Sequence, residues 1–166
     1  MKNNNKMLAA INEQINAELY SAYLYLAMAA YFEETNFKGF AHWMHIQAKE
    51  EMKHAMRFFK YVHGRLWQVN LTDIDAVKPN SWQSPQDAFE MSLAHEKEVT
   101  KRINNLMDIA ISTKDYPTQS CLKWFIDEQV EEEASLDAII QKMKLIGKNQ
   151  SLLLMLDAEL GKRSSE

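Results

Sequence analysis

Four glutamates of this chain lie at positions where a helix would carry apolar core residues. Along four stretches of the sequence, apolar side chains recur at alternating steps of three and four residues, which places them on one face of a helix. Each face is interrupted by one carboxylate, and the four are Glu18, Glu51, Glu96 and Glu132. Because an ionised carboxylate costs several kcal/mol to bury without a partner, these residues predict either a buried site that a cation neutralises or glutamates that stay protonated.

The residue types around these glutamates indicate a pair of metal ions. No Lys or Arg lies in register on the four faces, and the one basic residue that does is His54, three positions after Glu51. Four carboxylates balance the charge of two divalent cations, and a neutral imidazole adds a nitrogen ligand. We hypothesise that Glu51 bridges both ions. Glu18 and His54 would complete one site, and Glu96 and Glu132 the other. An oxygen-rich ligand set with one imidazole suits iron or manganese, and we expect iron.

Long helices must position these ligands, because apolar faces of this kind are buried only when four helices pack as a bundle. With four Gly, three Pro and a weak strand pattern, the sequence predicts an all-α fold. The first expected helix spans residues 6–34, and the second runs from the turn at 36–39 to residue 67. The third spans residues 85–114 after a cap at Ser84. The fourth begins after a turn and cap at Pro117 and Thr118 and ends at Gly147. Residues 68–84 should cross the length of the bundle, and residues 151–160 should form a short fifth helix.

Composition narrows the class of protein. A length of 166 residues with 46% hydrophobic residues predicts a single domain over 1–166, with the bundle at about 6–147. The net charge of -4 and the lack of a Lys/Arg block argue against nucleic acid or a membrane as partner. Without a long apolar segment or a second cysteine beside Cys121, a cytoplasmic protein is expected. The apolar run at 152–156 has no bundle face left to cover, which predicts a homo-oligomer.

Three segments together resemble the non-haem bacterial ferritins. The segments NEQINAELYSAYLY (12–25), QAKEEMKHAMR (47–57) and DYPTQSCLKWFIDEQVEEE (115–133) are similar, in order and spacing, to the metal-bearing segments of that family. The resemblance implies a ferritin-like four-helix bundle with one long crossover connection and a short C-terminal helix. It also implies a shell of about 24 subunits that oxidises Fe(II) with dioxygen or hydrogen peroxide and stores Fe(III) as a hydrated oxide.

The same resemblance assigns roles to individual residues. The first iron site would be formed by Glu18, Glu51 and His54, and the second by Glu51, Glu96 and Glu132. Gln129 matches a glutamine that lines the centre, where a hydrogen bond to a neighbour is expected more than ligation. Tyr25 matches a tyrosine beside the centre that donates a hydrogen bond or an electron. A third iron site would be formed by Glu50, Glu128, Glu131 and again Glu132.

Other functions fit less well. Met52 beside the Glu-x-x-His resembles the haem ligand of the bacterioferritins, but Glu132 is followed at three positions by Ser135 rather than by a second histidine, so haem is not expected. The alternative is a di-iron oxidoreductase or peroxidase of the rubrerythrin or bacterioferritin type, with a substrate pocket and a small oligomer. A purely structural shell subunit is a third possibility. The remaining histidines lack a partner in register, so surface or packing roles are expected for His42, His45, His63 and His95.

Overall fold

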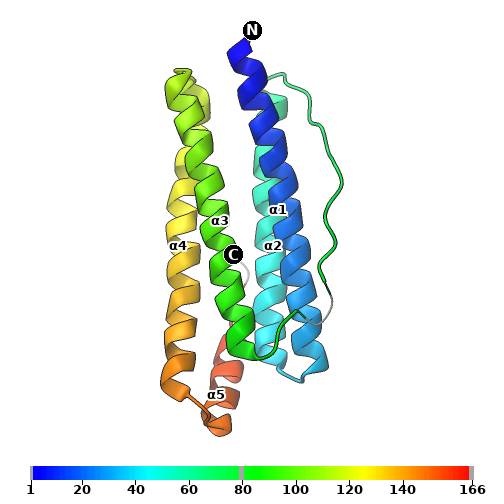
Figure 1. The fold of residues 1–166 in the computed structure, drawn as a ribbon, viewed down its shortest axis with the longest axis vertical. Coiled ribbons are helices and arrows are strands. Elements are labelled where there is room, and N and C mark those ends of the chain that lie inside the picture. The colour runs from blue at the N-terminus through cyan, green and yellow to red at the C-terminus, as the bar shows by residue number, and fades with distance from the viewer. Residues whose placement is uncertain (1, 79–80, 165–166) are drawn as a thin grey trace.

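A computed structural model describes residues 2–78 and 81–164, with side chains described from residue 6 onward. Five helices account for most of them, and no strand occurs among the described residues. The helices are α1 (Lys2–Glu34), α2 (Lys38–Gly64), α3 (Pro85–Ser112), α4 (Tyr116–Ile146) and α5 (Gln150–Leu160). The first four stand side by side as a bundle, and α5 lies at one end of it (Figure 1). The predicted all-α bundle with a short C-terminal helix is therefore confirmed.

The connection between α2 and α3 runs along the outside of the bundle from one end to the other (Figure 1). It is held to α1 by the Asn12 amide, which donates to the Gln68 carbonyl at 3.2 Å and accepts from the Asn70 backbone N–H at 2.9 Å. One turn further along, the Asn16 amide donates to the carbonyl of Asp73 at 3.0 Å. This long crossover, as predicted, makes α2 and α3 run in the same direction.

Several predicted helix boundaries differ from the structure: α1 begins at Lys2 rather than near Lys6, and α3 ends at Ser112 rather than near Lys114. The second helix ends at Gly64 rather than near Trp67, because Leu66 adopts a left-handed backbone with φ of 56° that stops the helix. At the start of α4, the cap is Asp115 rather than Thr118: the Asp115 side chain accepts the Thr118 backbone N–H at 3.3 Å. The predicted cap at Ser84 and the end at Gly147 agree with the structure.

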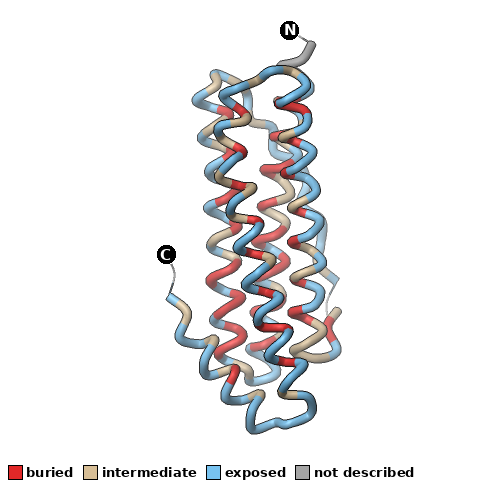
Figure 2. The backbone as a smooth tube through the Cα atoms, turned by 90° about the vertical axis from the view of Figure 1, so that its left-hand side faces the viewer, coloured by how far each residue is buried: buried red, intermediate tan, exposed pale blue. Residues whose placement is uncertain are grey.

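Buried residues occur along the whole length of the bundle, alternating with exposed ones on each long helix (Figure 2). They form two apolar clusters, one around Phe32, Phe40 and Phe89 and the other around Phe58 and Phe125. Along each of the four long helices, one cluster takes residues before the interrupting glutamate and the other takes residues after it. The carboxylates therefore form a polar layer between two apolar ends, where water is excluded from both directions.

Helix α5 packs back against the start of α2. The Asp157 side chain accepts the backbone N–H of Phe40 at 2.8 Å, which satisfies one of the free donors of the first turn of α2. A Cβ added at Gly39 would lie 1.7 Å from the Asp157 carbonyl oxygen, so only glycine permits this approach. Leu156 is buried by the contact, contrary to the expectation that the apolar run has no face of the bundle to cover.

Candidate metal centre

The first predicted group of ligands meets in the polar layer. Glu18 from α1 and Glu51 and His54 from α2 are all buried, and one possible ligand atom from each lies within 4.8 Å of the others. The His54 Nδ1 atom is 3.4 Å from Glu51 Oε2. The spacing of three residues along α2 places the imidazole and the carboxylate on the same helical face. This arrangement is compatible with one cation held by two carboxylates and one imidazole nitrogen.

The carboxylates of this group lack donors. Glu18 Oε1 accepts from Gln14 Nε2 at 2.8 Å, but Glu18 Oε2 and both oxygens of Glu51 are buried without a hydrogen-bond donor in the described part of the chain. Without a metal, a proton shared between Glu18 and Glu51 can offset part of this cost. Buried oxygens aimed at one another and lacking donors are what a cation site requires, so the residues present fit a bound metal ion.

Glu96 on α3 and Glu132 on α4 are also buried, and neutral groups hold them. The Tyr25 hydroxyl donates to Glu96 Oε1, and Gln129 Nε2 donates to Glu96 Oε2 at 3.1 Å. Gln129 therefore orients a predicted ligand through its amide nitrogen, as expected of a glutamine beside the centre. These contacts leave Glu96 directed into the polar layer, where Glu51 also lies.

Gln47 was not among the predicted site residues. Its Nε2 atom donates to Glu132 Oε2 at 2.6 Å, and its side chain is fully buried. Gln47 interrupts the apolar face of α2 one turn before Glu51, and this break in the pattern is the signal that could have identified it.

Burial and mutual repulsion shift the pKa of the carboxyl groups. Burial, followed by the neighbouring Glu51, raises the pKa of Glu18 well above its usual value, and burial, followed by Glu96, does the same for Glu51. Burial and then Glu96 raise the pKa of Glu132 to about 7. The pKa of Tyr25 is also raised, by burial and then by Glu96, so its phenol keeps its proton. The metal-free centre therefore holds protons that a bound cation would displace.

A second acidic group adjoins the first. The His54 Nε2 atom lies 3.9 Å from Glu128 Oε1, and one ligand atom each from His54, Glu128 and Glu132 fall within 4.8 Å of one another. The imidazole thus contacts both groups, although the sequence assigned it to the first. A cavity of about 440 Å³ adjoins the second acidic group and is lined by the four predicted third-site residues, Glu50, Glu128, Glu131 and Glu132. Ser135 and residues 162–164 complete its wall.

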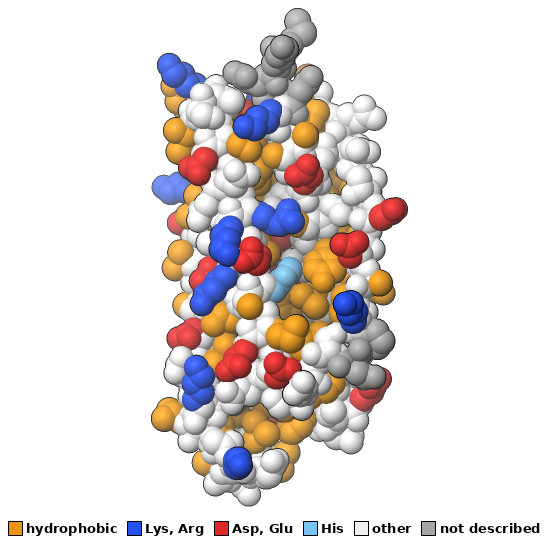
Figure 3. Space-filling model, viewed as in Figure 1, with side chains coloured by type: hydrophobic (Ala, Val, Ile, Leu, Met, Phe, Trp, Pro, Cys, Tyr) orange, Lys and Arg blue, Asp and Glu red, His pale blue; other side chains and the backbone are white. Residues whose placement is uncertain are grey.

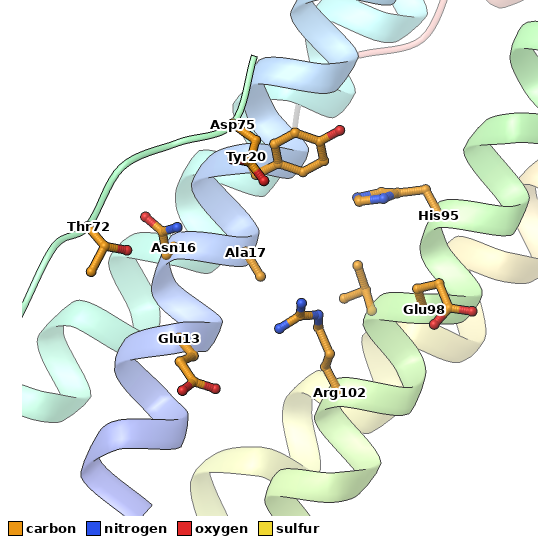
Figure 4. A pocket seen from close by; sticks show the side chains of 10 residues that line it. Glu13, Asn16, Ala17, Tyr20, Thr72, Asp75, His95, Glu98 and Arg102 are labelled. Atoms are coloured by element: carbon orange, nitrogen blue, oxygen red, sulfur yellow. The ribbon is translucent and has the colours of Figure 1, made fainter. Parts of the chain in front are cut away.

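Another cavity, of about 510 Å³, lies between α1, α3 and the crossover connection and contains none of the predicted ligands. Tyr20 from α1 and His95 and Arg102 from α3 point into it (Figure 4). The His95 ring lies 6.4 Å from that of Tyr25, edge to face, and its Nε2 atom is 2.7 Å from Ser21 Oγ. His95 packs against the rings of Tyr20 and Tyr25; a surface or packing role was expected for it from the sequence.

The surface shows no concentration of one charge on the face seen in Figure 3, where basic and acidic side chains are interspersed. Among the described residues, none of the helices has the length and apolar character needed to span a bilayer. Met52 is 45% exposed on α2.

Comparison with known proteins identifies several relatives. Residues 8–146 match the model of the ferritin-like domain. A bacterial non-heme ferritin of Bacteroides fragilis is 44% identical over 158 residues, covering 95% of this chain and 98% of the relative. One from Staphylococcus saprophyticus is 42% identical over 161 residues, covering 97% and 96%. The solved structure of an open-pore ferritin from the archaeon Archaeoglobus fulgidus is 48% identical, with a TM-score of 0.93 and 96% of both chains covered.

Proposed function

The chain belongs to the ferritin family, and on that premise we propose that it is an iron-storage ferroxidase. Its substrate would be Fe(II), oxidised between the four long helices and then stored as a hydrated Fe(III) oxide. The observation that carries the proposal is that buried oxygens of Glu18 and Glu51 lack hydrogen-bond donors. One of these oxygens, Glu51 Oε2, lies 3.4 Å from His54 Nδ1. A structural subunit would not keep such a set of carboxylates in its core, since it is costly without a cation.

The five predicted ligands in the polar layer would bind two Fe(II) ions. Glu18, Glu51 and His54 would bind one Fe(II), and Glu51, Glu96 and Glu132 would bind the second. Carboxylates are hard anionic ligands and favour Fe(III) over Fe(II), which makes the oxidation easier. Loss of two electrons to dioxygen or hydrogen peroxide raises the charge of the iron pair from about plus four to plus six, so water bound to iron gives up protons.

Tyr25 and Gln129 would hold Glu96 in its ligating orientation. The second acidic group would form the third iron site, in which Glu50, Glu128 and Glu131 act with Glu132. Two residues of its cavity wall, Glu128 and Glu132, lie close to His54, which suits transfer of iron between the two groups.

Storage requires a shell, and the exposed apolar side chains near α5 support assembly. Leu145 is 88% exposed and Met155 is 67% exposed, and both line a hollow of about 610 Å³ together with Leu152. Apolar groups gathered in this way favour contact with a second copy of the chain. We propose a homo-oligomer of about 24 subunits, each folded as one domain over 1–166, acting in the cytoplasm.

The activity is tested with Glu51→Ala, which removes the predicted bridging ligand. Initial rates of Fe(II) oxidation in air should fall at least about 100-fold. Glu98→Ala is the matched control, because Glu98 is exposed on α3 and its partner is Lys101. A Glu51→Ala protein that oxidised Fe(II) as fast as wild type would refute the proposed centre.

Storage is tested by size-exclusion chromatography with inline iron detection after a large excess of Fe(II) is added in air. Iron far above the number of binding sites should co-elute with a very large particle. Iron limited to about two or three ions per chain on a small oligomer would instead identify a di-iron oxidoreductase.

A further inference from the structure

The residues that follow α5 fold back over the cavity of the second acidic group. Arg163 Nη2 donates to Glu50 Oε2 at 2.5 Å, and Nη1 donates to Gln47 Oε1 at 2.8 Å. The Arg163 guanidinium also lies over the Trp43 ring, with Cζ 4.5 Å from its centroid. The Arg163 carbonyl accepts from His42 Nε2 at 2.8 Å. Three side-chain contacts and one backbone contact with α2 therefore hold Arg163 in the wall of the cavity.

These contacts connect Arg163 to two predicted iron ligands, Glu50 and Glu132. Gln47 and Glu50 are three residues apart and share one face of α2, so a single guanidinium can bind both. The same Gln47 donates to Glu132 through its Nε2 atom at 2.6 Å. Arg163 thus holds Glu50 directly and Glu132 through Gln47. Nothing in the sequence pattern indicated this role, because the two members of the ion pair are 113 residues apart.

The position of Arg163 follows from the packing of α5. Asp157 caps the start of α2, and Gly161 lies against Gly39, where an added Cβ would be 3.2 Å from the Gly39 Cα. The chain therefore leaves α5 directly beside α2 and reaches the acidic cavity within two residues. The ion pair is mostly shielded from water, with side-chain exposures of 25% for Arg163 and 17% for Glu50.

Arg163 occupies Glu50 Oε2, one of the two oxygens that a cation would use, and its positive charge opposes a cation at this carboxylate. We propose that Arg163 is a displaceable positioning residue: it neutralises Glu50 while the second acidic group is empty and leaves Glu50 when a divalent cation binds there. The inference rests on the proposed function, because it requires that this group binds cations. Arg163 competes with the metal for one ligand, so it lowers the affinity of this group and favours release of the ion.

The test is a calorimetric titration of the metal-free, assembled protein with Zn(II), a redox-inert probe. The second acidic group should provide the weaker class of sites, because Arg163 competes with the metal there. Arg163→Gln should tighten Zn(II) binding at these weaker sites about tenfold, since it removes the competing charge. Lys162→Gln is the matched control: it removes one positive charge from the adjacent exposed residue on the same cavity and should change affinity about twofold or less. Arg163→Lys, which keeps the charge but cannot bridge Gln47 and Glu50 in the same way, should lie between wild type and Arg163→Gln.

The direction of the effect separates competition from mere structural support. If Arg163 only stabilised the site, its loss would weaken Zn(II) binding, and that result or an effect equal to that of Lys162→Gln would overturn the inference. The tight sites around Glu18, Glu51 and His54 provide a separate readout. Their absence in wild type would refute the proposed function, whatever Arg163→Gln does.

A second measurement follows the tail itself. A nitroxide attached at Ser164→Cys, in a Cys121→Ala background, should become more mobile as Zn(II) fills the weaker sites. An unchanged spectrum at saturating Zn(II) would show that Arg163 stays in place and would overturn the inference.

Discussion

Replacing Glu51 by glutamine should stabilise the metal-free protein at high pH. Glu51 is 1% exposed, and neither of its oxygens has a donor among the described residues. Burial, followed by repulsion from Glu96 and Glu132, raises the pKa of Glu51 well above its usual value of 4.5. The unfolded chain ionises this group at lower pH than the native chain does. The protonated Glu51 carboxyl therefore makes its full contribution to the free energy of unfolding below about pH 4.5, and this contribution is lost as pH rises toward the pKa of Glu51 in the native chain.

Glutamine has no such dependence, and its amide can donate to the adjacent Glu18 carboxylate. An unpartnered buried polar group costs about 1–3 kcal/mol, and more when it is charged. We therefore expect Glu51→Gln to be about 2 kcal/mol more stable than wild type at pH 8 and roughly equal at pH 5. For a chain of this size the gain corresponds to a rise in Tm of roughly 4–8 °C.

The assay is thermal unfolding in the presence of a chelator, followed by circular dichroism at pH 5 and pH 8. Protein concentration must be the same for all samples, because assembly contributes to the Tm. Glu98→Gln is the control, since the Glu98 side chain is 63% exposed and should show no such pH-dependent gain. Added Zn(II) should reverse the order and favour wild type, which retains the ligand. A Glu51→Gln protein that melts below wild type at pH 8 without metal would refute the reasoning.

Three further predictions concern single contacts. Burial raises the pKa of Glu132 to about 7 in the native chain, so the free energy of unfolding of the metal-free protein should fall by on the order of 3 kcal/mol between about pH 4.5 and pH 7. Glu132→Gln should remove this part of the dependence of Tm on pH. A dependence unchanged from wild type would contradict the raised pKa. Gly39→Ala places a Cβ 1.7 Å from the Asp157 carbonyl oxygen, so it should displace α5 and lower the free energy of unfolding by about 1–3 kcal/mol. The C-terminus should then be cut by limited proteolysis. A variant as resistant to proteolysis as wild type would argue against this packing. Tyr25→Phe removes a hydrogen bond to Glu96 and should slow Fe(II) oxidation about tenfold at a stability cost near 1 kcal/mol, so an unchanged rate would exclude an orienting role.

Much of the fold could be predicted from local pattern. Helical periodicity identified the four long helices, and the polar stretch after α2 identified the crossover connection. Two of the boundaries that differed were decided by backbone conformation and capping: the left-handed residue Leu66 ends α2 early, and Asp115 caps α4. Such details depend on a few backbone torsions and on one hydrogen bond, to which an apolar pattern is insensitive.

For the site, the four glutamates that interrupt apolar faces needed no tertiary information, since a carboxylate in a core stripe is unusual in itself. The orienting groups were harder to predict. Gln47 could have been identified by the same break in pattern, but its contact with Glu132 joins α2 to α4 and depends on how the two helices pack.

The sequence by itself determined which side chains face the interior, because the position of a residue on a helix follows from its spacing along the chain. It thereby determined an all-α bundle with a layer of carboxylates and one imidazole. Only the tertiary structure decided which atoms meet: that His54 contacts both acidic groups, and that Arg163 reaches Glu50 from the far end of the chain. The physical reason is that hydrogen bonds and ion pairs between helices require approach within about 3–4 Å, which depends on the packing of the whole chain.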